Sequence, residues 1–416
     1  MTMQNENTQN EGGEKKSILD QIISNHQAEE VANLDAVEII QNLFGELNER
    51  ERDVLTRRFG LNGKEKETLE GIGSVHKLTR ERIRQIETAA VKKLRQLKRA
   101  ENYVAGLKRV INQLIEEHGG LMEKEYLLDN LVNFSAGGYR GRDGDLSTHK
   151  NNLDFLISKL LHDHFEEVNS HQYFKPSFKL KHQLLDHLEA LGAELLEKIK
   201  EAKTIFRTDE LFDLASNLES YKNYQEKFDT PNNLDISNVL KNELFEENAE
   251  LVNANKPIYS LLQAAKHIEQ NKFGHWGQYD WREIKPKTIN DKIYLVLKNH
   301  GKPMHFVDIT NRINEIDFDG KKANAATVHN ELILDKKYIL VGRGLYSLKE
   351  WGYQKGTVAE VIEEILKQAE SELTRDEIID KVMAQRLVKR ATIILALMNR
   401  NKFEKTGGKY KIKIAA

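Results

Sequence analysis

The sequence contains no cysteine, which excludes disulfide bonds, thiolate zinc sites and cysteine nucleophiles. It also has no run of about 18 apolar residues, the length that a membrane-spanning helix needs. The polar start, Met1 to Lys16, lacks the apolar core of a signal peptide. We therefore expect a cytoplasmic protein that has no membrane partner.

An excess of charge of one sign is missing from the chain as a whole. Its 63 Lys and Arg nearly balance 65 Asp and Glu, for a net charge of −2, so bulk charge predicts no partner. Locally the balance differs, because residues 79–99 hold eight Lys or Arg against two Glu, a concentration that attracts phosphate. Residues 285–416 hold 25 basic against 17 acidic residues, and residues 189–256 hold 8 against 15. This polarity suggests DNA-facing ends and a protein-facing centre, although solvated faces give similar counts.

Residue patterns typical of an enzyme are also absent. The neighbouring histidines lack cysteine partners and metal-ligand spacing, and the glycine cluster lacks the strand-to-helix setting and the Lys-Ser or Lys-Thr of a phosphate loop. These residues are His162, His164, His171, His182 and His187, and Gly137, Gly138, Gly141 and Gly144. No Ser/His/Asp order or spaced carboxylate pair stands out. We predict no enzymatic activity, no metal, no cofactor and no small-molecule substrate.

The length of 416 residues corresponds to about three ordinary domains, or to more small ones. After residue 101 the chain repeats three helices followed by two short strands, which is the order of a winged helix. The clearest hairpin pairs residues 338–341 with 345–348 across a Gly-Arg-Gly turn, and a second pairs 403–405 with 409–412. Fainter strands are predicted at 165–168, 172–178, 251–252 and 257–261.

The predicted fold class is mainly α, with an N-terminal helix-turn-helix followed by a tandem array of small winged-helix (α+β) units. The predicted boundaries are a disordered lead at 1–15, the helix-turn-helix at 16–100, two divergent winged-helix-like units at 101–180 and 181–270, an aromatic linker at 271–286, a winged helix at 287–352 and a C-terminal winged-helix-like unit at 355–414. Within the linker, the aromatics around Trp276 and Trp281 could stack on bases, but are expected rather to pin the linker against the next domain.

The most informative stretch is TLEGIGSVHKLTRERIRQIETAAVKKLR, from Thr68 to Arg95. Thr68 and Thr79 are plausible N-caps of two successive helices. In a helix from Thr79, one face holds Ile83, Ile86, Ala90 and Leu94, and another holds Arg80, Glu81, Arg84 and Gln85. Arg can pair with guanine, Glu can accept from cytosine and Gln can bond adenine, so the second face suits the major groove of DNA. A solvated charged helix face is the alternative.

This stretch, together with the preceding LNERERDVLTRRFGL, resembles region four of bacterial sigma factors, the helix-turn-helix that reads the minus-35 promoter element. The resemblance covers residues 40–97 and implies promoter DNA and RNA polymerase as partners, hence a nucleoid-associated location. It implies base contacts from Arg80, Glu81, Arg84 and Gln85, and places Arg82, Lys92, Lys93 and Arg95 nearer phosphates or neighbouring proteins. Gly71 departs from the family pattern, where an acidic residue usually follows TLE, and removes a capping-box partner for Thr68. No helix with the family's paired tryptophans is found, so a stand-alone initiation factor is not expected.

Residues 287–352 contain the stretches KPMHFVDITNRI, ATVHNEL and VGRGLYSLKEW. With these stretches the segment resembles the HARE-HTH module, a winged helix similar to the N-terminal domain of the RNA polymerase delta subunit. Arg343, between two glycines at the tip of the hairpin, could enter a minor groove and contact phosphates, or could be a solubilising turn residue.

Our main hypothesis from the sequence is a DNA-binding transcription factor that reads a promoter element and associates with RNA polymerase. Two alternatives stay open: a polymerase-associated modulator without sequence preference, similar to delta, and a DNA-binding helper subunit of a DNA-modifying system.

Overall fold

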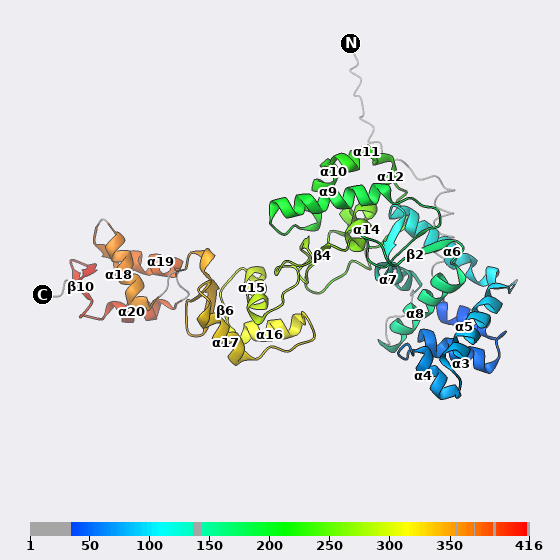
Figure 1. Ribbon diagram of the computed structural model, residues 1–416. Helices are drawn as coiled ribbons and strands as arrows, with labels where there is room; N and C mark the ends of the chain where they lie inside the picture. Colours follow the sequence, from blue (N-terminus) through cyan, green and yellow to red (C-terminus); the bar gives the residue numbers. More distant parts are fainter. Residues whose placement is uncertain are drawn as a thin grey trace, which may run out of the picture. The chain divides into compact units, whose positions relative to one another are not determined.

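The computed structural model describes residues 35–97, 99–135, 143–353, 356–369, 371–385 and 388–413. The predicted lead at 1–15 and most of the glycine loop around residue 140 lie outside this part of the chain. The chain is mainly helical and divides into two compact units, residues 1–269 and 270–416 (Figure 1). None of the helices within the described ranges is both long and apolar enough to span a membrane.

The described part of the first unit begins with four helices: α2 (Ala36–Phe44), α3 (Glu49–Phe59), α4 (Leu69–His76) and α5 (Arg80–Arg95). Their local signals are strong, because Asn48 and Glu51 form a capping box at the start of α3 and the Thr68 hydroxyl accepts a hydrogen bond from the Gly71 amide. Val54, Ile72 and Ile83 are fully buried and hold α3, α4 and α5 together. The N-caps predicted at Thr68 and Thr79, and the two successive helices that they begin, are confirmed.

The next segment has the elements α6 (Ala100–Glu117), β1 (Leu121–Glu123), α7 (Lys124–Ser135), α8 (Asp143–Phe155), a π-helical turn η1 (Leu156–Leu160), β2 (Phe165–Val168) and β3 (Ser177–Leu180). The strands form an antiparallel sheet in the order β1-β3-β2. The strand expected at 165–168 is confirmed, and the one expected at 172–178 begins later, at Ser177.

Between residues 186 and 264 the regular elements are helices, with an irregular stretch at 229–248. They are α9 (Asp186–Ala202), α10 (Thr208–Asn217), α11 (Glu219–Asn223), α12 (Gln225–Phe228), α13 (Ala249–Ala254) and α14 (Lys256–Ala264), and the short strand β4 (Ile268–Gln270) follows. The strands predicted at 251–252 and 257–261 were therefore wrong, and with them the wing of a second winged unit at 181–270. Asn248 caps α13 and Pro257 occupies the first turn of α14, positions that favour a helix. A short apolar run that is buried on all sides has the same sequence pattern in a strand and in a helix, so the pattern did not distinguish the two.

Helix α14 completes the core of the preceding segment instead of forming its own. The Ser260 hydroxyl donates to the Leu121 carbonyl of β1 at 2.5 Å, and α14 lies beside this part of the fold in Figure 1. Lys256 on α14 and Glu117 on α6, each 1% exposed, form an ion pair at 2.6 Å. Residues 100–264 thus share one interior rather than forming two separate domains.

The second unit contains β5 (Trp276–Gln278), α15 (Ile289–His300), β6 (Met304–His305), α16 (Phe306–Ile316), α17 (Ala325–Leu334), β7 (Tyr338–Leu340), β8 (Leu345–Leu348) and the 3-10 turn η2 (Lys349–Trp351). The strands of this segment form a sheet in the order β6-β8-β7, and the hairpin predicted between residues 338–341 and 345–348 is confirmed. Helix α17 is capped by Asn324, whose side chain accepts a hydrogen bond from the Ala326 amide.

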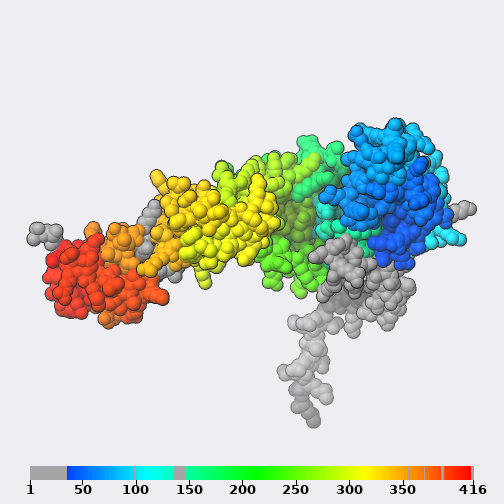
Figure 2. Space-filling view, turned by 90° about the horizontal axis from the view of Figure 1, so that it is seen from below, coloured from blue at the N-terminus to red at the C-terminus, as the bar shows by residue number. Residues whose placement is uncertain are grey.

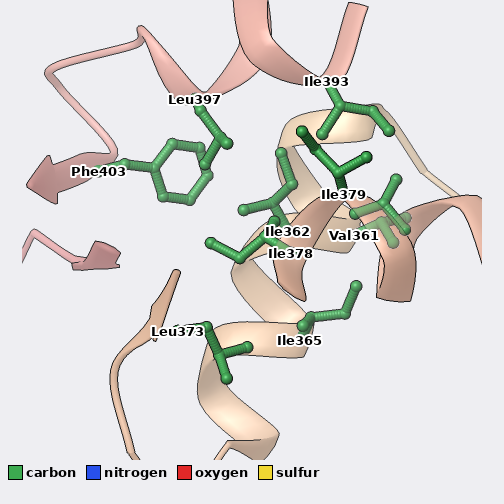
Figure 3. Packing of buried hydrophobic residues seen from close by; sticks show 10 residues of the cluster. Val361, Ile362, Ile365, Leu373, Ile378, Ile379, Ile393, Leu397 and Phe403 are labelled. Carbon is green, nitrogen blue, oxygen red and sulfur yellow. The ribbon is translucent and has the colours of Figure 1, made fainter. Parts of the chain in front are cut away.

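The C-terminal elements are α18 (Val358–Gln368), β9 (Leu373–Thr374), α19 (Arg375–Gln385), α20 (Arg390–Leu397), β10 (Phe403–Thr406) and β11 (Lys409–Ile412), with the sheet order β10-β11-β9. Figure 3 shows the three helices and the hairpin meeting around Ile362, Ile378, Ile393 and Phe403. The order helix, strand, helix, helix, hairpin therefore occurs three times, at 100–180, 289–348 and 358–412. In each case the last strand is the middle of the sheet.

Candidate nucleic-acid interface

The turn between α4 and α5 sets the orientation of α5 relative to α4. Lys77 adopts a left-handed conformation, and the Leu78 amide donates to the Gly73 carbonyl at 2.9 Å. A Cβ at position 73 would lie 2.7 Å from the Leu78 carbonyl oxygen, so the turn closes only around a glycine. The Thr79 hydroxyl then accepts from the Arg82 amide at 3.2 Å and starts α5 at Arg80.

Helix α5 has one packed face and one exposed face. Ile83, Ala90 and Leu94 are fully buried and Ile86 is half-buried. The four side chains predicted to contact bases, Arg80, Glu81, Arg84 and Gln85, are all exposed, and we call them the α5 polar face. No other described segment covers them, so they are accessible to a ligand whose groove is wide enough to admit a helix.

Within the α5 polar face the side chains are already paired. Arg84 donates to the Glu81 carboxylate through Nε at 2.8 Å and Nη2 at 2.6 Å, while Arg82 donates to Gln85 Oε1 at 3.1 Å. The hydrogen bonds from Arg84 lower the pKa of Glu81, and the same contact raises the pKa of Arg84. Both groups therefore carry full charge at neutral pH, and the face offers donors and acceptors side by side.

The residues predicted to contact phosphates divide into different environments. Arg82, Lys92, Lys93 and Arg95 are exposed on α5. Lys93 lies 3.5 Å from the Glu51 carboxylate, and the Arg95 guanidinium donates from Nε to the Lys159 carbonyl at 2.6 Å. Arg343 is also exposed, but it belongs to the second unit, in the turn between β7 and β8. The sequence pattern did not reveal that Arg95 reaches η1, because the contact spans 64 residues.

Comparison with known proteins decides what the α2–α5 segment is. Residues 43–96 match the family model of sigma-70, region 4. Residues 43–96, which include α3, α4 and α5, are a sigma-70 region 4. The chain is 38% identical over 86 residues to RNA polymerase sigma factor RpoS of Coxiella burnetii, covering 20% of this chain and 24% of that protein. It is 52% identical over 58 residues to RNA polymerase sigma factor SigA of Microcystis aeruginosa, covering 14% of each, and 40% identical over 94 residues to SigA of a Bacillus species, covering 22% and 25%.

The region 4 domain (α2–α5) is thus similar to a small part of those sigma factors, because this chain spans a quarter or less of their length. No solved structure matches the chain. The delta-like module expected at 287–352 lies outside the matching segment and stays a prediction.

The region 4 domain is docked on the segment that follows it in the first unit. Phe155, 1% exposed, lies between Phe44 and Phe59, with ring centroids 6.2 and 4.9 Å away. Gly60 ends α3 in a left-handed conformation, and its carbonyl accepts from Asn151 Nδ2 of α8 at 3.1 Å. Figure 2 shows the blue α2–α5 segment in contact with the following segment of this unit. Sequence reasoning missed this contact, because Phe155 reads as an ordinary core residue of its own segment.

The histidines singled out from the sequence go to separate environments. His171 lies 3.2 Å from Glu189, His187 is buried near the Gly119 carbonyl, and His162 is half-exposed beside Asp163. Among the described residues, no group of three or more His, Asp or Glu is placed to hold a metal ion.

The aromatic linker packs inward. Trp276 is 1% exposed, and Phe273 packs edge-on against Phe318 at 6.1 Å. Trp276 is therefore unavailable for stacking on bases, in agreement with the expectation that the linker is pinned against its neighbour.

Proposed function

We propose that this protein is a DNA-binding transcription factor that reads a double-stranded promoter element with α5 and associates with RNA polymerase. One observation carries the proposal: the α5 polar face is exposed on a capped, rigidly packed helix of a sigma-70 region 4. A major groove admits an α-helix, and Arg, Glu and Gln match the acceptors and donors that base pairs present there.

Association with polymerase is supported by the similar proteins, each of which is named as an RNA polymerase sigma factor. Residues Arg82, Lys92 and Lys93 flank the α5 polar face and are proposed to contact phosphates, which fixes the position of the helix without reading sequence. Arg95 shares this role only if it leaves the Lys159 carbonyl.

The three repeated segments support the proposal of a tandem arrangement of winged helices. Their element order and their sheets, in which the last strand lies in the middle, are those of such units. We propose that they carry additional contacts with DNA or with the polymerase, and that Arg343 serves as a phosphate contact at one hairpin tip.

Selection of bound duplexes from a random-sequence pool tests the reading role. The full chain should enrich a defined site, and Gln85→Ala should relax the preference at one base pair by roughly tenfold or more. Gln96→Ala is the matched control, because Gln96 is exposed at the far end of the same helix. Binding without any enriched site would contradict the reading role, and an affinity-tagged chain that captures no polymerase from its native cells would contradict the association.

A second candidate function, a polymerase-associated modulator without sequence preference, is favoured by one observation. The repeat at 289–348 exposes Ile333 and Leu334 at the end of α17, with the Leu334 side chain 77% exposed. Exposed apolar side chains suit a protein surface rather than a phosphate backbone. Salt-sensitive DNA binding with no enriched site, together with polymerase capture, would favour this candidate.

A further inference from the structure

The third helix of each repeated segment has a different environment, although the three segments share one topology. In the first repeat this helix is α8, and the region 4 domain covers it: Asn151 bonds the Gly60 carbonyl, Asp154 lies 3.1 Å from Lys66, and Phe155 is buried against Phe44 and Phe59. This helix cannot also enter a DNA groove while the docking is intact.

In the second repeat the third helix is α17, and it contains neither Lys nor Arg. Its exposed residues are Ala326, Thr327, Asn330, Ile333 and Leu334. A helix that offers no cation to phosphate gains little of the electrostatic attraction on which DNA affinity depends. The second repeat is therefore a poor candidate for duplex contact through this helix.

The third repeat separates its charges into two halves. Residues 357–380 hold eight Asp or Glu against two Lys or Arg, whereas residues 381–413 hold ten Lys or Arg against one Glu. The basic half runs from the end of α19 through α20 to the β10–β11 hairpin. Within α20 the only Lys or Arg is Arg390, which pairs with Asp376 of the acidic half. This segregation is hidden in the whole chain, whose net charge is −2.

The hairpin places its lysines in the open. Lys405, Lys409 and Lys411, here called the hairpin lysines, are all exposed, while Tyr410 and Ile412 alternate with them and are half-buried. Glu404, the single acidic residue of this half, lies 3.7 Å from Lys411, and the Lys405 ammonium lies 5.7 Å from the Tyr410 ring. Carboxylates of the acidic half also reach this surface, because Glu363 lies 3.5 Å from Lys402 and the charge of Lys409 helps to lower the pKa of Glu377. These few carboxylates do not balance the ten basic residues, so the hairpin keeps a positive potential.

We propose that the β10–β11 hairpin, with the basic residues that flank α20, forms a second, sequence-independent contact with the phosphate backbone of double-stranded DNA. A two-stranded ribbon fits a DNA groove, and lysines act as point charges on phosphate rather than as readers of base edges. Leu395 of α20 is 70% exposed, and its apolar side chain cannot form the hydrogen bonds that base reading needs. The inference rests on the proposed function only in taking duplex DNA as the ligand.

The test uses the full chain and a random-sequence duplex of about 40 base pairs, with the dissociation constant measured over a range of salt concentrations. The variant carries Lys405→Gln, Lys409→Gln and Lys411→Gln. Each phosphate contact contributes about 0.9 to the slope of log affinity against log salt, so the slope should fall by about one for each lysine and the affinity by roughly tenfold or more. Replacing the same three lysines with Arg keeps the charges and should retain the wild-type slope.

The matched control is Lys321→Gln, Lys336→Gln and Lys349→Gln, which removes the same charge from exposed positions of the second repeat. It should leave the slope within about one of the wild type. Equal losses in the control and hairpin variants would overturn the inference, because bulk charge alone would explain them. An unchanged slope in the hairpin variant would also overturn the inference. So would a hairpin variant that loses binding to phosphatidylserine vesicles but keeps its affinity for DNA.

Failure of the proposed function gives a different result. If α5 reads no sequence, the random-sequence duplex still reports the hairpin contact, because that contact needs no specific site. If only the hairpin contact fails, Gln85→Ala still changes the selected site while the hairpin variant has the wild-type salt slope.

Discussion

Arg84 and Glu81 form a two-point ion pair on the exposed surface of α5, with Nε to Oε2 at 2.8 Å and Nη2 to Oε1 at 2.6 Å. Both side chains are 58% exposed, so the pair contributes little to stability. It does hold the Arg84 guanidinium beside an acceptor on the exposed face of α5. In the proposed complex with DNA, Arg84 would exchange the carboxylate for a guanine edge at small cost, and Glu81 would become available to accept from cytosine.

Replacing Glu81 with Gln tests this exchange. The variant loses one negative charge that repels phosphate, so binding to random-sequence duplex should strengthen a few-fold. Discrimination at the base pair that Glu81 contacts should fall by roughly tenfold. Competition binding with single-base variants of the selected site measures both effects. Glu65→Gln removes the same charge from an exposed position outside α5 and should not change base discrimination.

Thr79→Ala tests the cap that starts α5. The hydroxyl accepts from the Arg82 amide, and loss of such a cap costs about 1 kcal/mol. The first turn, which carries Arg80 and Glu81, should exchange its amide hydrogens faster, as measured by hydrogen exchange. Thr79→Ser keeps an acceptor at the same place and should preserve the protection. Equal protection in both variants would show that packing of Ile83 alone holds the turn.

Phe155→Ala tests the docking of the region 4 domain on the rest of the first unit. Removal of a buried Phe ring costs about 3–5 kcal/mol, and here the loss falls on the contact with Phe44 and Phe59. Hydrogen exchange should increase in α2 and α8, while α5 keeps its own core of Val54, Ile72 and Ile83 and its base preference. Phe155→Leu should have a smaller effect in the same direction. Loss of base preference in the alanine variant would show that docking also shapes α5.

His118 gives the first unit a pH dependence. Burial lowers the pKa of His118 to about 3, with the Lys256 charge acting in the same direction. In the unfolded chain the imidazole binds a proton near pH 6.5. Between these values the unfolded state binds more protons, so the unfolding free energy falls as the pH drops below about 6.5, by up to about 1.4 kcal/mol per pH unit from this residue.

Hydrogen exchange of the α6–α7 segment at pH 7, 6 and 5, after correction for intrinsic rates, measures that slope. His118→Gln should reduce it, although not to zero, because burial also lowers the pKa of His187. An identical slope in wild type and variant would contradict the assignment of the effect to His118.

The sequence-based predictions that were confirmed rest on local signals. The caps at Thr68 and Thr79 and the isoleucine spacing of α5 depend on residues within a few positions of one another, and the structure contains each of them. The hairpin at 338–348 likewise follows from short apolar runs around glycines. These features are determined by backbone preference and periodicity, which a single sequence displays.

The features that were missed depend on contacts between distant residues. The docking of Phe155 on Phe44 and Phe59 and the bond from Arg95 to the Lys159 carbonyl leave no local pattern. The misassigned strands at 251–261 belong to α13 and α14, which are buried because other helices surround them. Contact with distant segments was the missing information in each case.

The most direct measurement of the central claim is methylation interference on the selected duplex. N7 of guanine lies in the major groove, whereas N3 of adenine lies in the minor groove. If α5 reads the major groove, methylation at guanine N7 within the site should block binding, and Arg84→Ala or Arg80→Ala should abolish the interference at one guanine. Interference confined to adenine N3, or a guanine pattern that no substitution on the α5 polar face alters, would contradict the account.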